Sequence, residues 1–153
     1  MMAELKRILL VEDNPNDIEL TLAALSEYNL ANEVVVARDG AEALDYLYRR
    51  GDFKMRAPGN PAVVLLDLKM PKVDGIEVLR QIKSDDNLKT MPVVVLTSSR
   101  EDKDLIASYN LNTNGYVVKP VQFKEFVDAI KTLGAFWAVI NEPPVGSAKK
   151  ERK

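Results

Sequence analysis

The chain has no cysteine and no histidine among its 153 residues. Without cysteine there is no disulfide framework, no thiol nucleophile and no thiolate metal site. Without histidine the commonest general base and the commonest transition-metal ligand are absent as well. Any metal that this sequence binds should therefore be a hard cation with oxygen ligands.

The sequence also lacks long apolar runs and a strong excess of either charge. No apolar run is long enough to span a bilayer. The first residues, "MMAELKRILLV", do not resemble a signal peptide, because they contain an acid and only a short apolar run. The formal net charge of −2 gives no support for binding to nucleic acid or to a membrane. We expect a cytoplasmic protein with neither nucleic acid nor membrane among its partners.

Short apolar runs alternate with segments of helical periodicity along the chain. The runs are β-branched and apolar on both faces, as buried parallel strands are. They lie at residues 7–11, 33–37, 62–66, 92–96 and 115–119. Between the first two runs, Ile18, Leu22 and Leu25 share one helical face. Five βα units in series predict an α/β fold with a five-stranded, doubly wound parallel sheet.

Local signals mark the ends of the predicted helices. Asn14 followed by Pro15 is typical of an N-cap and a first helical position. Asp74-Gly75 marks another helix start, and Gly51 marks a helix stop. The last helix should run from about Phe123 to about Val139.

Two segments lie outside the βα plan. The segment "GDFKMRAPGNP" (51–61) is rich in Gly, Pro and charge, and we expect a long surface loop there. The segment "NEPPVGSAKKERK" (141–153) is polar and should be partly disordered. We therefore expect one domain at 1–140 and a tail at 141–153, with no output domain after it.

Polar residues occupy the carboxyl ends of four predicted strands, where open α/β sheets bind their ligands. These residues are Glu12, Asp13, Asp67, Thr97 and Lys119. Three carboxylates packed together repel one another, and Mg²⁺ would relieve that repulsion. A lysine and a hydroxyl around one carboxylate suit phosphoryl transfer, which depends mainly on positioning and charge stabilisation. Asp67 would then be the nucleophile and would form an acyl phosphate.

Each of these residues also has an ordinary structural explanation. A single Asp after a strand is more often a helix cap or a turn residue, and Glu12-Asp13 suits a solvated turn. Lys119 before Pro120 suits a surface position, and Thr97 with the two serines after it suits an N-cap cluster. The convergence of four strand ends nevertheless favours the joint functional interpretation.

Four sequence blocks together resemble bacterial response-regulator receiver domains. The blocks are "LLVEDNPND", "VVLLDLKMPKVDGIEVL", "PVVVLTSS" and "YVVKP", in the order found in that family. The resemblance covers roughly residues 5 to 140. It implies a (βα)5 flavodoxin-like topology and a single-domain response regulator of a two-component system. Such a protein is a phosphoacceptor rather than an enzyme, although it assists its own phosphorylation and dephosphorylation, and a histidine kinase is its partner.

The resemblance implies a role for each matching residue. Asp67 resembles the phosphoacceptor, and Lys119 resembles the lysine that contacts the phosphoryl group. Glu12 and Asp13 resemble the acidic pair that binds Mg²⁺ together with the phosphoacceptor, and the backbone carbonyl of Lys69 resembles a further ligand.

The resemblance also covers the parts of the domain that respond to phosphorylation. Thr97 and Tyr116 resemble the switch pair, in which a hydroxyl and an aromatic ring change position after phosphorylation. Pro120 resembles the proline whose preceding peptide bond, here Lys119-Pro120, is cis.

Three features look like the small stand-alone receivers that partner bacterial phytochrome histidine kinases. Segment 51–61 is longer than in most receivers, Asn112-Thr113 stands where many have Gly-Ala, and "AFW" (135–137) ends the last predicted helix. This likeness implies a phytochrome as the kinase and a homodimer formed by the helix at 100–110, the fifth strand and the last helix.

The last helix has an apolar group that suits such an interface. The helical stripe that includes Trp137 should face the sheet. Phe136 and Val139 lie off that stripe and should form an exposed apolar group. We therefore expect Phe136, Trp137 and Val139 to support the dimer. Alternatively, the tail folds back and covers Phe136 within the same chain.

Three other functions compete with a phosphorylated receiver. Haloacid-dehalogenase-type phosphatases or phosphotransferases typically have Asp-x-Asp, but Lys69 occupies the second position here. A nucleotide- or flavin-binding module would need a phosphate loop, whereas "EDNPND" is acidic and has no glycine. A receiver-like module that is never phosphorylated is disfavoured by the intact set of Asp67, Thr97 and Lys119.

Overall fold

Five parallel strands form one sheet in the order β2-β1-β3-β4-β5. The computed structural model describes residues 7–26, 34–68, 74–97, 115–119, 124–125 and 128. The strands are β1 (Ile8–Val11), β2 (Val34–Ala37), β3 (Val63–Asp67), β4 (Val93–Thr97) and β5 (Gly115–Val118). This order is the flavodoxin-like one. The predicted fold class is confirmed, and each strand lies within one residue of the range predicted for it.

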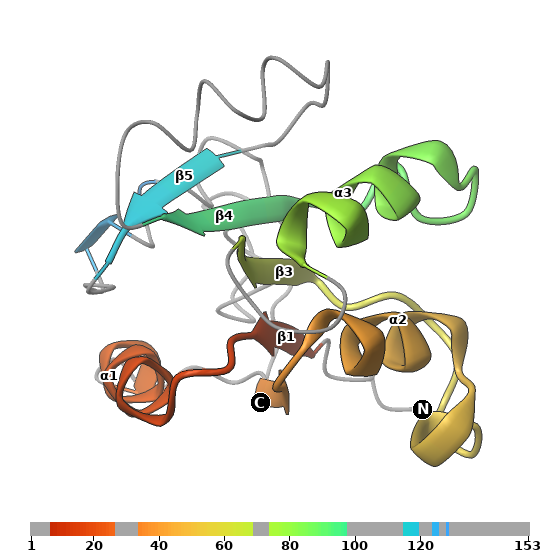
Figure 1. Cartoon of the computed structure of the whole chain (residues 1–153), viewed down its shortest axis with the longest axis horizontal. Coiled ribbons are helices and arrows are strands. Elements are labelled where there is room, and N and C mark those ends of the chain that lie inside the picture. Colours follow the sequence, from red (N-terminus) through yellow and green to blue (C-terminus); the bar gives the residue numbers. More distant parts are fainter. Residues whose placement is uncertain are drawn as a thin grey trace, which may run out of the picture.

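Helices cover both faces of the sheet, as a doubly wound fold requires. Successive residues of a strand point to opposite faces. On one face Leu9, Val64 and the other strand residues that point the same way pack against two helices. These are α2 (Gly40–Tyr48) and α3 (Gly75–Ser84). On the other face the intervening residues pack against α1 (Pro15–Ser26). Figure 1 shows α1 on one side of the sheet and α2 with α3 on the other.

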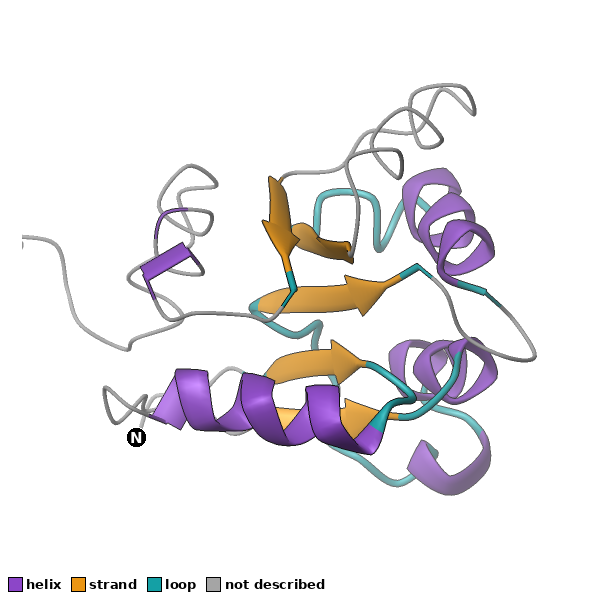
Figure 2. Ribbon diagram, turned by 60° about the vertical axis from the view of Figure 1, so that its left-hand side comes forward, coloured by secondary structure: helices purple, strands orange, loops and turns teal. Residues whose placement is uncertain are grey.

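The register of the sheet brings the strand ends to one edge. Val11 pairs with Leu66, Asp67 pairs with Leu96, and Thr97 pairs with Val118. Figure 2 shows loops leaving the arrowheads of the central strands at this edge. The residues that end or follow β1, β3, β4 and β5 therefore share one side of the molecule.

Two helices begin where the sequence predicts. The side chain of Asn14 accepts a hydrogen bond from the backbone N–H of Asp17 at 3.1 Å, and Pro15 is the first residue of α1. The side chain of Asp74 accepts one from the backbone N–H of Glu77 at 3.0 Å, at the start of α3. In both cases the cap satisfies a backbone donor that the helix itself leaves unpaired.

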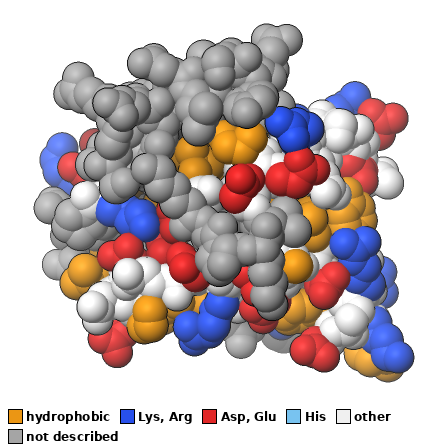
Figure 3. All heavy atoms as spheres, viewed as in Figure 1, with side chains coloured by type: hydrophobic (Ala, Val, Ile, Leu, Met, Phe, Trp, Pro, Cys, Tyr) orange, Lys and Arg blue, Asp and Glu red, His pale blue; other side chains and the backbone are white. Residues whose placement is uncertain are grey.

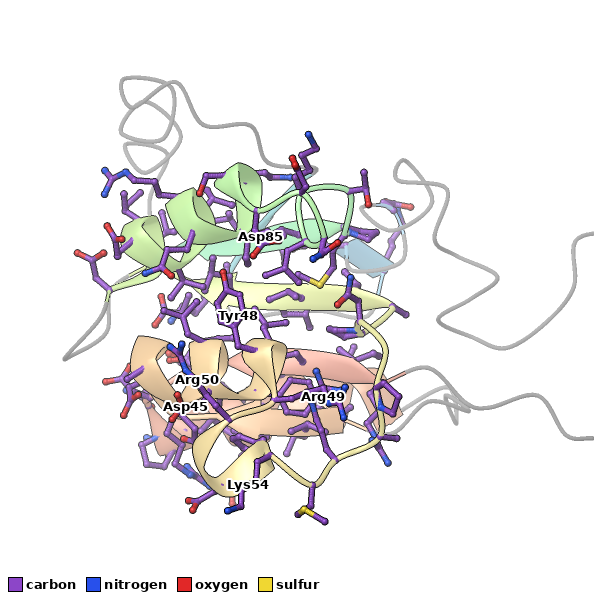
Figure 4. The ribbon with its side chains drawn as sticks, turned by 90° about the vertical axis from the view of Figure 1, so that its right-hand side faces the viewer. Asp45, Tyr48, Arg49, Arg50, Lys54 and Asp85 are labelled. Atoms are coloured by element: carbon purple, nitrogen blue, oxygen red, sulfur yellow. The ribbon has the colours of Figure 1, made fainter. Side chains whose placement is uncertain are left out.

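The predicted helix stop at Gly51 is slightly misplaced. The helix α2 ends at Tyr48, and Arg49 caps it in the left-handed region with φ 56°. This conformation is uncommon outside glycine. Arg50 then pairs with Asp45 of α2 at 2.8 Å (Figure 4). The helix therefore ends before Gly51, and the ion pair of Arg50 lies between the helix end and the glycine.

Segment 51–61 is a largely exposed loop, as predicted, and specific contacts hold part of it against α2. Gly51–Phe53 forms a short 3₁₀ helix, η1. The ring of Phe53 packs edge-on against Tyr46 with centroids 5.1 Å apart. The guanidinium of Arg56 lies 4.1 Å from the centroid of the same tyrosine ring, and its Nε donates to the Tyr46 carbonyl at 2.7 Å. Aromatic and cation–π contacts thus hold this segment against α2.

The surface of the described residues carries both signs of charge. On the face shown in Figure 3, acidic and basic side chains lie interspersed. None of the helices in the described part of the chain has the length and hydropathy of a bilayer-spanning helix.

Several predicted elements lie outside the described residues. These are the helix at 100–110, most of the last helix, and the tail at 141–153. Within the last predicted helix, Lys124, Glu125 and Asp128 are helical and exposed. The domain boundary at residue 140 stays a prediction.

Candidate functional site

Three carboxylates gather at the carboxyl edge of the sheet. Glu12, Asp13 and Asp67 each place one carboxylate oxygen within 4.8 Å of the others. Glu12 follows β1 and extends it, because its backbone N–H donates to the carbonyl of Ala37 in β2 at 2.9 Å. Asp67 is the last residue of β3. The parallel strands therefore bring Asp67 next to two acids that lie 54 and 55 residues before it in the sequence.

The acids differ in their exposure to solvent. Glu12 is fully buried, Asp67 is 5% exposed, and Asp13 is partly exposed. Buried carboxylates need a compensating charge or hydrogen bonds. An all-oxygen set open to solvent on one side suits a hard divalent cation.

Lys119 supplies one compensating charge. It follows β5, and its Nζ lies 3.1 Å from Oε1 of Glu12 and 3.5 Å from Oδ2 of Asp67. Its side chain is 16% exposed, so these ion pairs are largely shielded from water. The ammonium thus links the acids at the ends of β1 and β3.

Asp17 is a site residue that sequence reasoning missed. It lies in the first turn of α1, and its Oδ2 accepts a hydrogen bond from Lys119 Nζ at 3.0 Å. The signal available in the sequence was its spacing, four residues after Asp13 and about one helical turn away. That spacing alone does not indicate a contact with a residue 102 positions further along the chain.

The surroundings of Glu12 disfavour its charged form. Burial raises the pKa of Glu12 to about 7, and the neighbouring charge of Asp67 adds to the rise. Hydrogen bonds from Lys119 and from the backbone N–H of Asn14, at 3.1 Å each, act in the opposite direction. A divalent cation beside Glu12 would favour the carboxylate and remove this penalty.

Lys119 is a firmly held cation. Burial acts to lower its pKa, but a hydrogen bond to Asp17 and the charges of Asp67 and Glu12 outweigh burial and raise the pKa. Lys119 therefore stays charged at neutral pH.

Gly75 lets α3 approach the backbone next to Asp67. Its N–H donates to the carbonyl of Leu68 at 2.9 Å. A Cβ at this position would overlap the carbonyl oxygen of Asp67 and lie 2.5 Å from Cα of Leu68. The sequence indicated Asp74-Gly75 only as a helix start. The glycine also permits the close packing of that start against the end of β3.

The other predicted site residues are only partly described or lie outside the described residues. Thr97 ends β4, and Tyr116 lies in β5 opposite Val95, but the structure describes only their backbones. The remaining residues fall outside the described ranges: Lys69, Pro120, Phe136, Trp137 and Val139. Their predicted roles stay predictions.

The chain is similar in sequence and in structure to known signalling proteins. The family model of the response regulator receiver domain matches residues 8–131. The response regulator Rcp1 of Synechocystis sp. (strain ATCC 27184 / PCC 6803 / Kazusa) is 40% identical over 132 residues, which are 86% of this chain and 88% of Rcp1. A crystal structure of the Mn(2+)-bound form of Rcp1 matches with a TM-score of 0.67 and covers 87% of this chain and 92% of that one.

Two further solved structures are similar over nearly the whole chain. The bacteriophytochrome response regulator AtBRR is 63% identical, with a TM-score of 0.86, and the match covers 92% of this chain and 100% of that one. The phosphorylated cyanobacterial phytochrome response regulator RcpA is 39% identical, with a TM-score of 0.70, and the match covers 94% of this chain and 100% of that one. With the matched sequence blocks, the flavodoxin-like sheet and the acids at its carboxyl edge, these likenesses show that the chain belongs to the response-regulator receiver family.

Proposed function

We propose that Asp67 accepts a phosphoryl group from the phosphohistidine of a histidine kinase. The observation that carries this proposal is the position of Lys119, whose Nζ lies 3.5 Å from Oδ2 of Asp67 while Glu12 and Asp13 gather beside the same carboxylate. A cation on one side and a group of acids suited to a metal on the other is the environment that phosphoryl transfer needs.

The transfer requires no acid or base from this chain. An oxygen of the Asp67 carboxylate forms a bond to phosphorus while the bond from phosphorus to the imidazole nitrogen of the kinase breaks, and that nitrogen keeps the electron pair. The donor belongs to another molecule, because this chain has no histidine. Lys119 stabilises the negative charge on the transferred phosphoryl oxygens.

We further propose that the cation bound here is Mg²⁺, with Glu12, Asp13 and Asp67 as side-chain ligands and the carbonyl of Lys69 as another. The fit rests on an all-oxygen donor set and on a buried Glu12 that lacks full charge compensation. The similar Rcp1 structure is of a Mn²⁺-bound form, and Mn²⁺ is another divalent cation that prefers oxygen ligands. When bound, the cation neutralises charge on the acceptor and on the incoming phosphoryl group.

We infer that the partner is a phytochrome histidine kinase. The support is the naming of AtBRR and RcpA as phytochrome response regulators, together with the share of both chains that each match covers. In this interpretation the chain is a phosphorylated switch rather than an enzyme with its own substrate. Thr97 and Tyr116 would report phosphorylation to the protein surface. A cytoplasmic location stays a prediction.

Labelling with acetyl phosphate tests the acceptor. Wild type and Asp67→Asn are incubated with acetyl phosphate and Mg²⁺, and the intact mass is measured. The matched control is Asp86→Asn, because the Asp86 side chain is 89% exposed and lies after α3. We expect one phosphoryl group on wild type and on the control, none on Asp67→Asn, and none on any of them in excess EDTA. Labelling of Asp67→Asn at the wild-type level would refute the assignment.

A further inference from the structure

Lys119 is held more closely by α1 than by the proposed acceptor. Its Nζ lies 3.0 Å from Oδ2 of Asp17 and 3.1 Å from Oε1 of Glu12, but 3.5 Å from Oδ2 of Asp67. The two shorter contacts are hydrogen bonds. Before any phosphoryl group arrives, the ammonium is therefore directed mainly toward residues other than the acceptor.

Asp17 is in a fixed position at the start of its helix. Its backbone N–H donates to the cap residue Asn14 at 3.1 Å, and its side chain is only 29% exposed. Its Oδ2 accepts a hydrogen bond from Lys119 Nζ at 3.0 Å, and the Lys119 side chain is itself only 16% exposed. Asp17 is thus a strong partner of Lys119 and not a passing surface contact.

Asp17 differs from Glu12 in its relation to the metal. Glu12 belongs to the group of carboxylates whose oxygens lie within 4.8 Å of one another, and Asp17 is not a member of that group in the described part of the chain. A cation bound there would draw on the charge of Glu12. Asp17 would keep its full charge for Lys119.

A phosphoryl group on Asp67 and the carboxylate of Asp17 would compete for the same ammonium. A phosphoryl group adds charge and three acceptor oxygens next to Asp67. An ammonium has three N–H donors, and two of them already point to Asp17 and Glu12. The third donor alone can serve the phosphoryl group without loss, but an ammonium that moves closer to Asp67 than its present 3.5 Å, or gives a second donor to the phosphoryl oxygens, weakens its contact with Asp17.

We propose that Asp17 is a positioning residue that holds Lys119 on the α1 side of the site and so limits how tightly a phosphoryl group on Asp67 is bound. The inference rests on the proposed function of Asp67. It assigns to α1 a restraint on the phosphorylated state that acts through Lys119.

Beryllofluoride, a phosphoryl mimic, measures this restraint directly. Its dissociation constant is determined in saturating Mg²⁺ for wild type, Asp17→Asn and Glu19→Gln. Glu19 is the matched control, because it is an exposed acid on the same helix and its change removes the same charge. We expect Asp17→Asn to bind beryllofluoride about threefold to fivefold more tightly than wild type, as for the loss of one ion pair. Glu19→Gln should stay within about twofold of wild type.

A double-mutant cycle shows whether the effect passes through Lys119. Lys119→Met is measured with and without Asp17→Asn. We expect the tightening caused by Asp17→Asn to disappear when Lys119 is absent. Tightening that persists without Lys119, or an Asp17→Asn variant that binds no more tightly than Glu19→Gln, would overturn the inference.

A measurement on the unmodified protein separates this inference from the proposed function. ¹⁵N NMR of the Lys119 ammonium should show faster hydrogen exchange in Asp17→Asn than in wild type or Glu19→Gln, because a charge-assisted hydrogen bond is replaced by a weaker one to a neutral amide. Unchanged exchange overturns the inference alone. Wild type that binds no beryllofluoride in Mg²⁺ contradicts the proposed function and the inference with it, even where the exchange result holds.

Discussion

Glu12 is the residue at which folding and metal binding are most closely linked. Its carboxyl group is fully buried beside Asp67, and its pKa rises from an ordinary value of 4.5 to about 7. Between these two pH values the folded chain binds more protons at this residue than the unfolded chain does. Stability without metal therefore falls as pH rises through this range, by roughly 3 kcal/mol from Glu12.

The variant Glu12→Gln tests this linkage. An uncharged glutamine does not titrate, so the variant lacks this loss of stability. The unfolding free energy of Glu12→Gln minus that of wild type should therefore rise by roughly 3 kcal/mol between a pH below 4.5 and pH 8. Urea unfolding in EDTA at several pH values measures it. A difference that does not change with pH would contradict the raised pKa of Glu12.

At the element scale, Gly75 controls how closely α3 approaches the end of β3. Replacing a helical glycine by alanine ordinarily stabilises a helix, by up to about 1 kcal/mol at an interior position and less in the first turn. Here the added Cβ would overlap backbone atoms of Asp67 and Leu68, so we expect Gly75→Ala to destabilise by about 1 to 3 kcal/mol. It should also weaken Mg²⁺ binding, because Asp67 is displaced.

Ser84→Ala is the matched control for Gly75→Ala, because Ser84 is exposed at the other end of α3. Urea unfolding and Mg²⁺ titration of both variants decide the matter. Stabilisation of Gly75→Ala, or unchanged Mg²⁺ affinity, would show that the close approach at Gly75 is unimportant.

The elements also show why sequence reasoning succeeded in some places and failed in others. The strands and the caps at Asn14 and Asp74 are determined by local patterns, so they were predictable. The exposed loop after α2 was predictable from its composition, but the contacts of Phe53 and Arg56 with Tyr46 were not. A second contact of this long-range kind joins α2 to the end of α3, where Tyr48 extends toward Asp85 (Figure 4). Burial and the hydrogen bond with Asp85 raise the pKa of Tyr48.

The residues of the candidate site also divide into those that the sequence indicated and those that only the structure shows. The sequence indicated Glu12, Asp13, Asp67 and Lys119 because parallel strands place their carboxyl ends together. Asp17 was not predictable, because it reaches Lys119 only through the packing of α1 against the sheet. Gly75 was interpreted as a helix start, and its proximity to Asp67 follows from the loop geometry that only the structure shows.

At the scale of the whole molecule, we predict a homodimer that depends on Phe136. The residue lies outside the described ranges, and the prediction rests on its place off the predicted buried stripe of the last helix. Sedimentation equilibrium at micromolar concentration should show a dimer for wild type and a monomer for Phe136→Asp.

Glu125→Gln is the control for Phe136→Asp, since Glu125 is exposed in the same predicted helix. It should dimerise as wild type does. A monomeric wild type, or a Phe136→Asp variant that dimerises equally well, would contradict the predicted interface.

The whole fold brings the acids of β1 and β3 and the lysine after β5 to one edge, and the central claim is that Asp67 is phosphorylated at this edge. The most direct measurement is to phosphorylate the chain with a phytochrome histidine kinase in Mg²⁺, reduce the acyl phosphate with borohydride, and map the product by peptide mass spectrometry. Reduction converts a phosphorylated aspartate to homoserine. We predict homoserine at position 67 and at no other aspartate. Homoserine at a different position, with Asp67 unmodified, would contradict the account.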